Sequence, residues 1–544
     1  MSENGFSGAP FLTRRQLLQR MGLVGGSSMV MGAMSAWDLM GAPIAPRPDW
    51  QRSREGERVL ILGAGVSGLV TGYELGKLGY DYQILEARDR VGGLNWSVKR
   101  GMEHTELGAG GERQVCEFDE GEYINAGPWR IPNAHHGILG YCKELGVRLE
   151  RFIDDNTVMF NEDPALGPLA GRKIHLRELK SDLWGSTTEL LAKALDQGSL
   201  DRELSVEDKE RMLEFLVTAG YLNRADHIYQ PNAALRGNED KYDLSLLLGS
   251  PFTRAVRSLT SGTGGPDPVF QPTGGMMEIP LAFQRVIGDR LTLRAEVTTI
   301  RQTDDGVRVV YRDTANGEER ELSADYLVCC LPMAILKKLD INFSPEMATA
   351  VEATGHSSSS KMGLQMARRF WEDDDGIYGG HLQYQPYSPQ AVSQAAAGGG
   401  GGGRGGRVRS PLPSFSYPSN DFGSKKGVLL GFYGNPGVPG LDGTPLLDAP
   451  VRDRIEYVLT HASRVHPQIR EEFESAYVVW WPRVKYSEGA WANARGGSRE
   501  QLVKGDRRIY IGSSVVSGHA AWQEGAVEAA WMTVDSIHQR VSQG

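Results

Sequence analysis

The sequence predicts an α/β fold, and three consecutive features between residues 59 and 86 carry this prediction. Residues 59–62 are apolar and form a segment of the length of a buried strand. The motif Gly-Ala-Gly-Val-Ser-Gly at 63–68 follows directly and opens a segment with an apolar helical face. Residues 82–85 form a second apolar strand, which ends at Glu86. A strand, a glycine-rich turn, a helix and a strand ending in an acid are typical of a Rossmann-like domain.

Each glycine of this motif has a physical role. Gly63 allows the tight turn, Gly65 lets the backbone approach a pyrophosphate, and Gly68 lets the helix pack closely on the strand. The helix N-terminus offers free N–H groups and a positive dipole to the phosphates. Glu86 lies 18 residues after Gly68, where an acid that binds a ribose hydroxyl is expected. These residues therefore predict a dinucleotide site.

The composition excludes several classes of protein. The 544 residues include 68 acidic and 59 basic side chains, so the formal net charge is −9. Without a basic excess, nucleic-acid binding is not expected. No apolar run reaches the roughly 18 residues of a membrane span, so the mature protein is expected to have none. The 68 glycines are an excess over the usual share of about 7%.

Two segments are predicted to lie outside the folded domains. Residues 1–41 carry Arg14-Arg15 ahead of leucines and a modestly apolar stretch, which resembles a bacterial twin-arginine export signal. This predicts a periplasmic or secreted protein, with a basic amphipathic N-terminal helix as the alternative. Residues 42–56 are expected to be a linker. Residues 383–413, which contain an alanine and glycine tract at 395–406, are expected to be a flexible insertion.

The cysteines and histidines do not predict a metal site. None of the cysteines forms a Cys-x-x-Cys pair, and burial is the favoured interpretation over metal ligation or a disulfide. The histidines lack metal-ligand spacing and are interpreted as structural, although two of them could approach the site from distant parts of the chain. The residues concerned are Cys116, Cys142, Cys329, Cys330, His135, His136, His227 and His519.

The continuation after Glu86 resembles the flavin amine oxidase family. Arg88 and Arg90 precede Gly92 and Gly93, and this family has an acid, an arginine-rich turn and a Gly-Gly pair in that order. The resemblance implies that FAD is the cofactor and that the Gly-Gly backbone lies against its pyrophosphate. Leu94 stands where the family usually has arginine. NAD remains an alternative cofactor.

The resemblance extends to further cofactor residues. It implies that Val297 offers its backbone to the adenine, that Trp481 packs near the isoalloxazine ring, and that a late strand ends at Gly512 beside the cofactor. Ser513 follows where family members commonly have an acid. Gly127 is expected at a turn where backbone approaches the dinucleotide or substrate. No cysteine occurs near the family's covalent attachment position, so non-covalent FAD is expected.

Four residues are candidates for the catalytic site. The segment Gly127-Pro128-Trp129-Arg130 resembles L-amino acid oxidases, in which this arginine holds the substrate carboxylate. A guanidinium fork matches carboxylate geometry. The resemblance further implies that Lys361 holds a water against flavin N5, that Tyr417 assists the arginine and that Trp522 walls the substrate site.

The resulting hypothesis is FAD-dependent oxidative deamination of L-amino acids. Hydride transfer from Cα to flavin N5 would lead to a 2-oxo acid and ammonia, while O2 would yield H2O2. The alternatives are an amino-acid 2-monooxygenase, an amine or polyamine oxidase, and a flavin-binding protein without catalysis. Side-chain specificity and oligomeric state stay open, with a homodimer as one option.

The resemblance also implies a discontinuous arrangement of domains, as in monoamine oxidases. A Rossmann-like FAD-binding domain is expected from residues 57–120, 271–345 and 476–544. A substrate domain with a mixed sheet is expected from 121–159 and 346–475. Residues 160–270 are expected to form a helical domain or a lid over the active-site entrance.

Overall fold

The computed structural model describes residues 46–51, 56–108, 111–198, 204–231, 241–249, 268–387, 410–435, 437–494 and 496–543. The expected leader at 1–41 and the tract at 395–406 lie outside these residues, as do most of the expected linker and insertion. Within the described ranges, no helix combines the length and the apolar character needed to cross a membrane.

A parallel sheet forms the nucleotide-binding part of the fold, with the strand order β12-β2-β1-β16-β25. Its members are β1 (Arg58–Leu62), β2 (Asp81–Leu85), β12 (Leu291–Thr292), β16 (Tyr326–Cys329) and β25 (Ile509–Ile511). β1 pairs in parallel with β2 on one side and with β16 on the other. The strands come from three distant stretches of the chain, so the predicted α/β class and the discontinuous Rossmann-like domain are confirmed.

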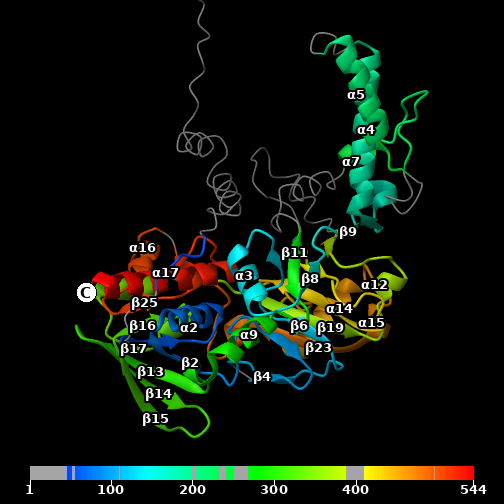
Figure 1. Cartoon of the computed structure of the whole chain (residues 1–544). Helices are drawn as coiled ribbons and strands as arrows, with labels where there is room; N and C mark the ends of the chain where they lie inside the picture. Colours follow the sequence, from blue (N-terminus) through cyan, green and yellow to red (C-terminus); the bar gives the residue numbers. More distant parts are fainter. Residues whose placement is uncertain are drawn as a thin grey trace, which may run out of the picture. The chain divides into compact units, whose positions relative to one another are not determined.

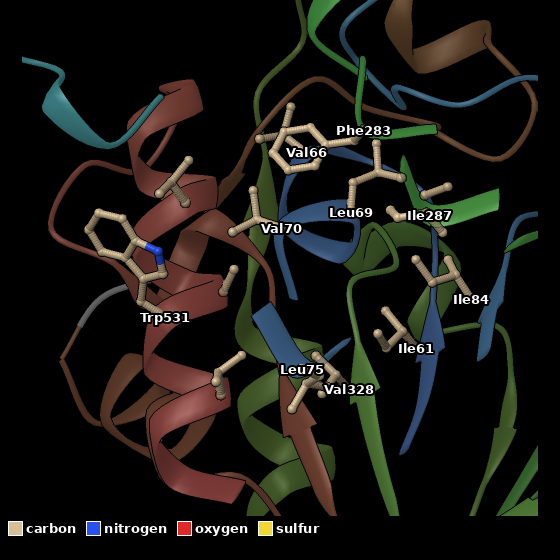
Figure 2. Close-up of a cluster of buried hydrophobic side chains, with 14 of the residues drawn as sticks. Ile61, Val66, Leu69, Val70, Leu75, Ile84, Phe283, Ile287, Val328 and Trp531 are labelled. Atoms are coloured by element: carbon tan, nitrogen blue, oxygen red, sulfur yellow. The ribbon is translucent and has the colours of Figure 1, made fainter. Parts of the chain in front are cut away.

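Helices pack on this sheet, and one of them, α2, begins within the glycine motif. They are α2 (Val66–Leu78), α3 (His136–Glu144), α9 (Glu278–Ile287) and α17 (Gln523–Gln543). α2 contacts both α9 and α17, and Figure 1 shows α2 and α17 side by side. Figure 2 shows the hydrophobic core between the sheet and these helices. In this core Ile61 and Ile84 of the sheet pack with Leu69 of α2 and Phe283 of α9. Burial of these side chains holds the N-terminus of α2 at the end of β1.

A mixed sheet, with the order β10-β9-β20-β21-β22-β19-β23, forms the second layer. Its strands are β9 (Thr157–Asn161), β10 (Lys173–His175), β19 (Ser360–Met366), β20 (His381–Gln385), β21 (Phe415–Ser416), β22 (Gly427–Gly434) and β23 (Phe473–Trp480). β19 is buried along its whole length between β22 and β23. The helices α12 (Phe370–Asp373), α14 (Val451–Ala462) and α15 (Ile469–Glu472) contribute side chains to its core.

Smaller sheets complete the fold. They are built from β3 (Ser97–Lys99), β4 (Glu103–Thr105), β5 (Arg113–Val115), β6 (Tyr123–Asn125), β7 (Ile131–Pro132), β8 (Leu149–Phe152), β11 (Val269–Pro272), β13 (Ala295–Gln302), β14 (Val307–Asp313), β15 (Glu319–Ala324), β17 (Asp340–Ile341), β18 (Gly355–His356) and β24 (Ala492–Asn493). The remaining short helices are α10 (Met333–Leu336), α11 (Pro345–Ala353), α16 (Gly497–Lys504), η1 (Pro164–Leu169), η2 (Gly288–Arg290), η3 (Trp481–Arg483) and η4 (Ser514–Val516).

One segment of alternating sequence contributes to two sheets. Residues 291–300 do not form one strand but contribute to β12 and β13. Arg294 has a φ of 61°, a left-handed conformation that an extended strand cannot contain. The break lets β12 join the parallel sheet while β13 pairs with β14 in an antiparallel one.

The segment expected to be helical contains both helices and strands. α4 (Leu176–Asp196) contacts α5 (Val206–Ala219) and α7 (Leu244–Gly249). α5 begins at Ser205, whose side chain accepts a hydrogen bond from the backbone N–H of Asp208 and caps the helix. η1 and β10 precede α4 and tie this segment to the mixed sheet through β9. The expected role as a lid stays a prediction.

Candidate functional site

A cavity of ≈ 550 Å³ is lined by most of the residues that the sequence singled out. They come from the glycine motif, the Gly-Gly pair, the mixed sheet and the C-terminal helix. These predicted residues in the lining are Gly63, Gly65, Glu86, Arg88, Gly92, Gly93, Gly127, Val297, Lys361, Trp481, Gly512, Ser513 and Trp522. Gly68 packs behind the lining, and Arg130 and Tyr417 are not among the lining residues.

The two glycine motifs lie against each other at one end of the cavity. Gly65 and Gly92 form a parallel β-bridge, and the Gly92 N–H donates to the Ala64 carbonyl at 2.7 Å. Gly63 has a φ of +96° and Gly92 of +101°, conformations that L side chains rarely adopt. A Cβ on Gly68 would lie 2.0 Å from the Gly63 oxygen, so only glycine lets α2 start so close to β1. The result is a cradle of bare backbone at the N-terminus of α2.

The acid at the end of β2 is oriented by backbone N–H groups. The Glu86 side chain is 4% exposed. Its Oε2 accepts from the Ala64 N–H at 2.9 Å, and its Oε1 accepts from the Arg88 N–H at 3.0 Å. The Arg88 guanidinium donates to the Lys485 carbonyl and the Ser487 hydroxyl, both at 2.7 Å. Burial lowers the pKa of Arg88, with the Glu86 charge opposing the shift.

The C-terminal strand closes the cradle from the other side. The Ser67 hydroxyl donates to the Gly512 carbonyl, and the Gly512 N–H donates to the Cys329 carbonyl at 2.8 Å. A Cβ on Gly512 would lie 2.6 Å from the Cys330 Sγ. All four cysteines are free, and of these Cys330 alone lines the cavity. Burial raises the pKa of the Cys330 thiol and favours its unreactive neutral form.

The residues present fit a dinucleotide of the size of FAD. The cradle offers backbone to phosphates, and the Glu86 carboxylate lies on the wall of the cavity. In addition, Gln523 Nε2 is buried on the lining and has no hydrogen-bond partner within the described part of the chain. A buried amide group is costly to leave unsatisfied, so this donor is suited to a ligand. Trp481, 2% exposed, is held on the opposite wall because its Nε1 donates to the Ala126 carbonyl at 2.8 Å.

Lys361 reaches the cavity from the middle of the mixed sheet. Its side chain is 2% exposed, and Nζ donates to the carbonyls of Asn125, at 3.2 Å, and Gly127. The ammonium position lies 4.6 Å from the centre of the Trp129 ring and 4.5 Å from that of Tyr433. Burial, and then the nearby Arg130 charge, lowers the pKa of Lys361 well below its ordinary value of 10.5. A neutral amine gives both hydrogens to the two carbonyls and keeps a lone pair that can accept a hydrogen bond.

Arg130 lies beside the cavity, against the tryptophan that lines it. Its Cζ is 5.8 Å from the centre of the Trp522 ring, and its side chain is 17% exposed. The His135 ring meets the same indole edge-on with centroids 4.9 Å apart. Burial, and then the charges of His519, His136 and Arg130, lowers the pKa of His135 to about 4. The structure therefore brings an arginine and a neutral imidazole to the same indole, and the arginine lies close enough to Lys361 to lower its pKa.

Tyr417 is not brought to this place, which corrects the expected contact with Arg130. Its side chain is fully buried in the core of the mixed sheet, where its hydroxyl lies 2.8 Å from His466 Nε2. Side chains alternate along a strand, and Ser416 of β21 points to the opposite side, where its hydroxyl contacts His381. Among the described residues, two tyrosines line the cavity, Tyr486 and Tyr433, and Tyr433 of β22 is the cross-strand partner of Lys361.

Sequence reasoning missed several lining residues. Tyr433 could have been found as the last aromatic residue of the apolar strand at 427–434. Trp491, for which a core position is the natural expectation, also lines the cavity. Gln523 has no local signal beyond its place next to Trp522. Ala521, another lining residue, has a φ of 72°. No sequence pattern predicts this left-handed conformation for an alanine.

Two of the remaining histidines have structural partners. His227 Nδ1 lies 2.8 Å from Asp196 in the helical segment. His519 Nδ1 lies 2.8 Å from Glu528 on α17, and its ring is 6.3 Å from that of His135. The Glu528 hydrogen bond raises the pKa of His519. His519 thus lies behind the imidazole that contacts Trp522.

The chain is similar to several known proteins. The chain matches the family model of flavin containing amine oxidoreductases over residues 66–538. It is 26% identical over 526 residues to a flavin-dependent L-tryptophan oxidase of Lentzea aerocolonigenes, covering 89% of this chain and 98% of that relative. It is 26% identical over 347 residues to an L-amino-acid oxidase of Demansia vestigiata, covering 60% of this chain and 60% of that relative. The solved cyclohexylamine oxidase from Brevibacterium oxydans IH-35A has a TM-score of 0.55 at 15% identity, covers 89% of this chain and 99% of its own, and shares the fold.

Proposed function

Because the chain belongs to the flavin containing amine oxidoreductase family and has FAD as its cofactor, we propose that it is an L-amino acid oxidase. The proposed reaction converts an L-amino acid, water and O2 into a 2-oxo acid, ammonia and H2O2. The observation that carries the proposal is the position of the Arg130 guanidinium. It lies against the cavity-lining Trp522, and its charge helps to lower the pKa of Lys361. A carboxylate is the ligand that such a guanidinium matches.

Under this proposal the cradle and its surrounding walls hold FAD without a covalent bond. The residues assigned to it are Gly63, Gly65, Gly68, Glu86, Arg88, Gly92, Gly93, Gly127, Val297, Trp481, Gly512 and Ser513. Bound FAD supplies a two-electron acceptor that O2 can reoxidise. Cys330, the cavity-lining cysteine, lies at the cradle end against Gly512, which supports a dissociable cofactor. Denaturation should therefore release all of the FAD into the supernatant.

The side chains around Arg130 orient the substrate. Arg130 binds the carboxylate and Trp522 provides a flat wall. These two contacts fix the arrangement of the substituents around Cα, so one enantiomer is selected. Lys361, with its pKa lowered by burial, accepts a hydrogen bond from a water through its lone pair. Tyr433 lies next to Lys361 and within reach of the Arg130 charge, and we assign to it the role of assisting Arg130 that the resemblance implies for Tyr417. Its pKa is raised by burial, so it stays a neutral hydrogen-bond donor.

An amine oxidase is the second candidate, and one specific contact favours it. Arg130 already has a carboxylate partner, because its Nε lies 3.2 Å from Asp154 Oδ2. Asp154 balances the Arg130 charge without any substrate carboxylate, as an amine oxidase requires. The solved cyclohexylamine oxidase, by its name, acts on an amine without a carboxylate.

One experiment separates these functions. The purified holoenzyme is given L-amino acids, D-amino acids and the amines made by removing their α-carboxyl groups, and H2O2 and organic products are measured. We expect H2O2 and 2-oxo acids from L-amino acids alone. Oxidation of amines but not of L-amino acids would overturn the proposal, and an amide product would identify a 2-monooxygenase instead.

We also propose that residues 1–41 direct export by the twin-arginine route. The support is the Arg14-Arg15 pair ahead of the leucines and the apolar stretch. Replacement of both arginines by lysine should leave the full-length protein in the cytoplasm of a bacterial host, as measured by cell fractionation. Unchanged export of the double variant would contradict the proposal.

A further inference from the structure

A carboxylate outside the cavity connects Arg130 to a histidine of the mixed sheet. Asp154 lies in the turn between β8 and β9, and its side chain is 14% exposed. Its Oδ2 is 3.2 Å from Arg130 Nε, and its Oδ1 is 2.6 Å from His381 Nε2. Each oxygen therefore faces a different donor, and one short side chain joins two segments that are far apart in the sequence.

His381 is itself held from two sides. Its Nδ1 lies 2.6 Å from the Ser416 hydroxyl of β21, and its backbone N–H donates to the Asn156 carbonyl at 2.9 Å. A carboxylate only accepts hydrogen bonds, so Nε2 carries a proton. In the neutral ring Nδ1 then accepts from the Ser416 hydroxyl. The turn that carries Asp154 is thus fixed both through its backbone and through its side chain.

This arrangement has a direct consequence for the guanidinium. An arginine side chain has many rotamers, and each contact, here an ion pair, that restricts it before ligand arrival reduces the ordering cost on binding. Asp154 contacts the Arg130 guanidinium at its Nε edge, which is the edge away from the tip of the side chain. This contact sets the orientation of the guanidinium plane. Burial disfavours the Asp154 charge, but the His381 hydrogen bond and the Arg130 charge outweigh it and lower the pKa of Asp154. The carboxylate therefore keeps its charge at neutral pH.

We propose that Asp154 and His381 are positioning residues that orient Arg130 for the substrate carboxylate. The inference rests on the proposed function, in which Arg130 binds that carboxylate. Asp154 does not touch the substrate. It acts through Arg130, and His381 acts through Asp154.

The central test is Asp154→Asn, with Asp155→Asn as the matched control. Asparagine has no charge to pair with Arg130 and only one acceptor oxygen, so it cannot keep both the ion pair with Arg130 and the hydrogen bond with His381. Asp155 is the next residue of the same turn and is exposed. Asp154→Asn should raise KM for an L-amino acid about tenfold, with little change in kcat. KM, or the inhibition constant, of the corresponding decarboxylated amine should stay within about twofold. Asp155→Asn should match the wild type.

A second pair of variants keeps the inference testable if Asp154→Asn fails to fold. Glutamine can place an amide N–H where His381 Nε2 lies, whereas alanine cannot. We expect His381→Ala to raise KM for the L-amino acid and His381→Gln to restore it, with FAD content and melting temperature unchanged in both. Equal changes for amino acid and amine, or no change in either, would overturn the inference.

Failure of the proposed function gives a different result from failure of this inference. If Arg130→Met leaves the KM values of amino acid and amine unchanged, Arg130 does not bind the carboxylate and both proposals fall. If Arg130→Met removes the preference for the amino acid but the Asp154 and His381 variants keep it, only the positioning role is wrong.

Discussion

Replacement of Gly65 by alanine tests whether the glycine cradle holds FAD. Gly65 has φ −72° and ψ 177°, which alanine adopts without strain, and a Cβ there would meet no protein atom within 4 Å. The protein itself should therefore tolerate the methyl group, at a cost of about 0.5–1 kcal/mol for the helix N-terminus. The space that the methyl group enters is the cavity.

The size of the effect follows from the contact that is lost. A hydrogen bond between a backbone N–H and a charged phosphate contributes about 1.5–3 kcal/mol. Loss of one such bond raises the Kd of FAD about 10- to 150-fold. Gly68→Ala should behave differently, because its Cβ would lie 2.0 Å from the Gly63 oxygen and would push α2 from the sheet. That variant should lose both stability and FAD.

The assay is reconstitution of the apoprotein with FAD, followed by quenching of flavin fluorescence. Gly140→Ala is the control, since Gly140 is an exposed residue of α3 with open space around a Cβ. It should leave the Kd of FAD unchanged and stabilise the helix by up to about 1 kcal/mol. Wild-type affinity for FAD in Gly65→Ala would refute the assignment of this cradle to the cofactor.

Three further predictions concern other parts of the molecule. Arg454 lies 2.6 and 2.9 Å from the Glu106 oxygens and both are buried, so Arg454→Met should lower the free energy of unfolding by about 3–5 kcal/mol in urea titrations; a loss under 1 kcal/mol would contradict this. Lys361→Met removes the amine that is proposed to hold a water beside the flavin, so it should slow reoxidation of the reduced protein by O2 about 100-fold in stopped-flow experiments and leave anaerobic reduction nearly unchanged; equal slowing of both would refute this role of Lys361. Because the pKa of His135 is lowered from 6.5 to about 4, its contribution to stability is complete above pH 6.5 and is lost as the pH falls towards 4. His135→Gln should remove up to about 3 kcal/mol of this pH dependence, and an unchanged stability profile would count against a neutral His135.

The cofactor end of the site could be predicted from the sequence because local backbone requirements encode it. Gly63 and Gly92 need positive φ, Gly68 needs contact without a side chain, and the acid must end the second strand. These backbone requirements restrict which residues can stand at each position between 63 and 93, and the sequence pattern is therefore recognisable. The parallel sheet could also be predicted, because its central strands β1 and β16 are largely apolar and buried.

The substrate end depends on strand register, which no local pattern encodes. Lys361 and Tyr433 meet only because β19 and β22 pair in one register, and that register shifts between Met362 and Gly363. A change of one residue moves a side chain to the other face of the sheet, so the sequence alone does not tell whether Ser416 or Tyr417 faces the core. Asp154 is an ordinary turn residue until the fold places it between two distant donors.

Substrate preference for the carboxylate is the most direct test of the account. The measurement is kcat/KM for one L-amino acid divided by that for its decarboxylated amine, in the wild type, in Arg130→Met and in Arg148→Met, a control at an exposed arginine. Methionine keeps much of the apolar stem against Trp522 but removes the charge. The account predicts a ratio far above one in the wild type and in Arg148→Met, and a ratio at least about 100-fold lower in Arg130→Met, equivalent to about 3 kcal/mol. A wild-type ratio below one, or a ratio that Arg130→Met does not change, would contradict it.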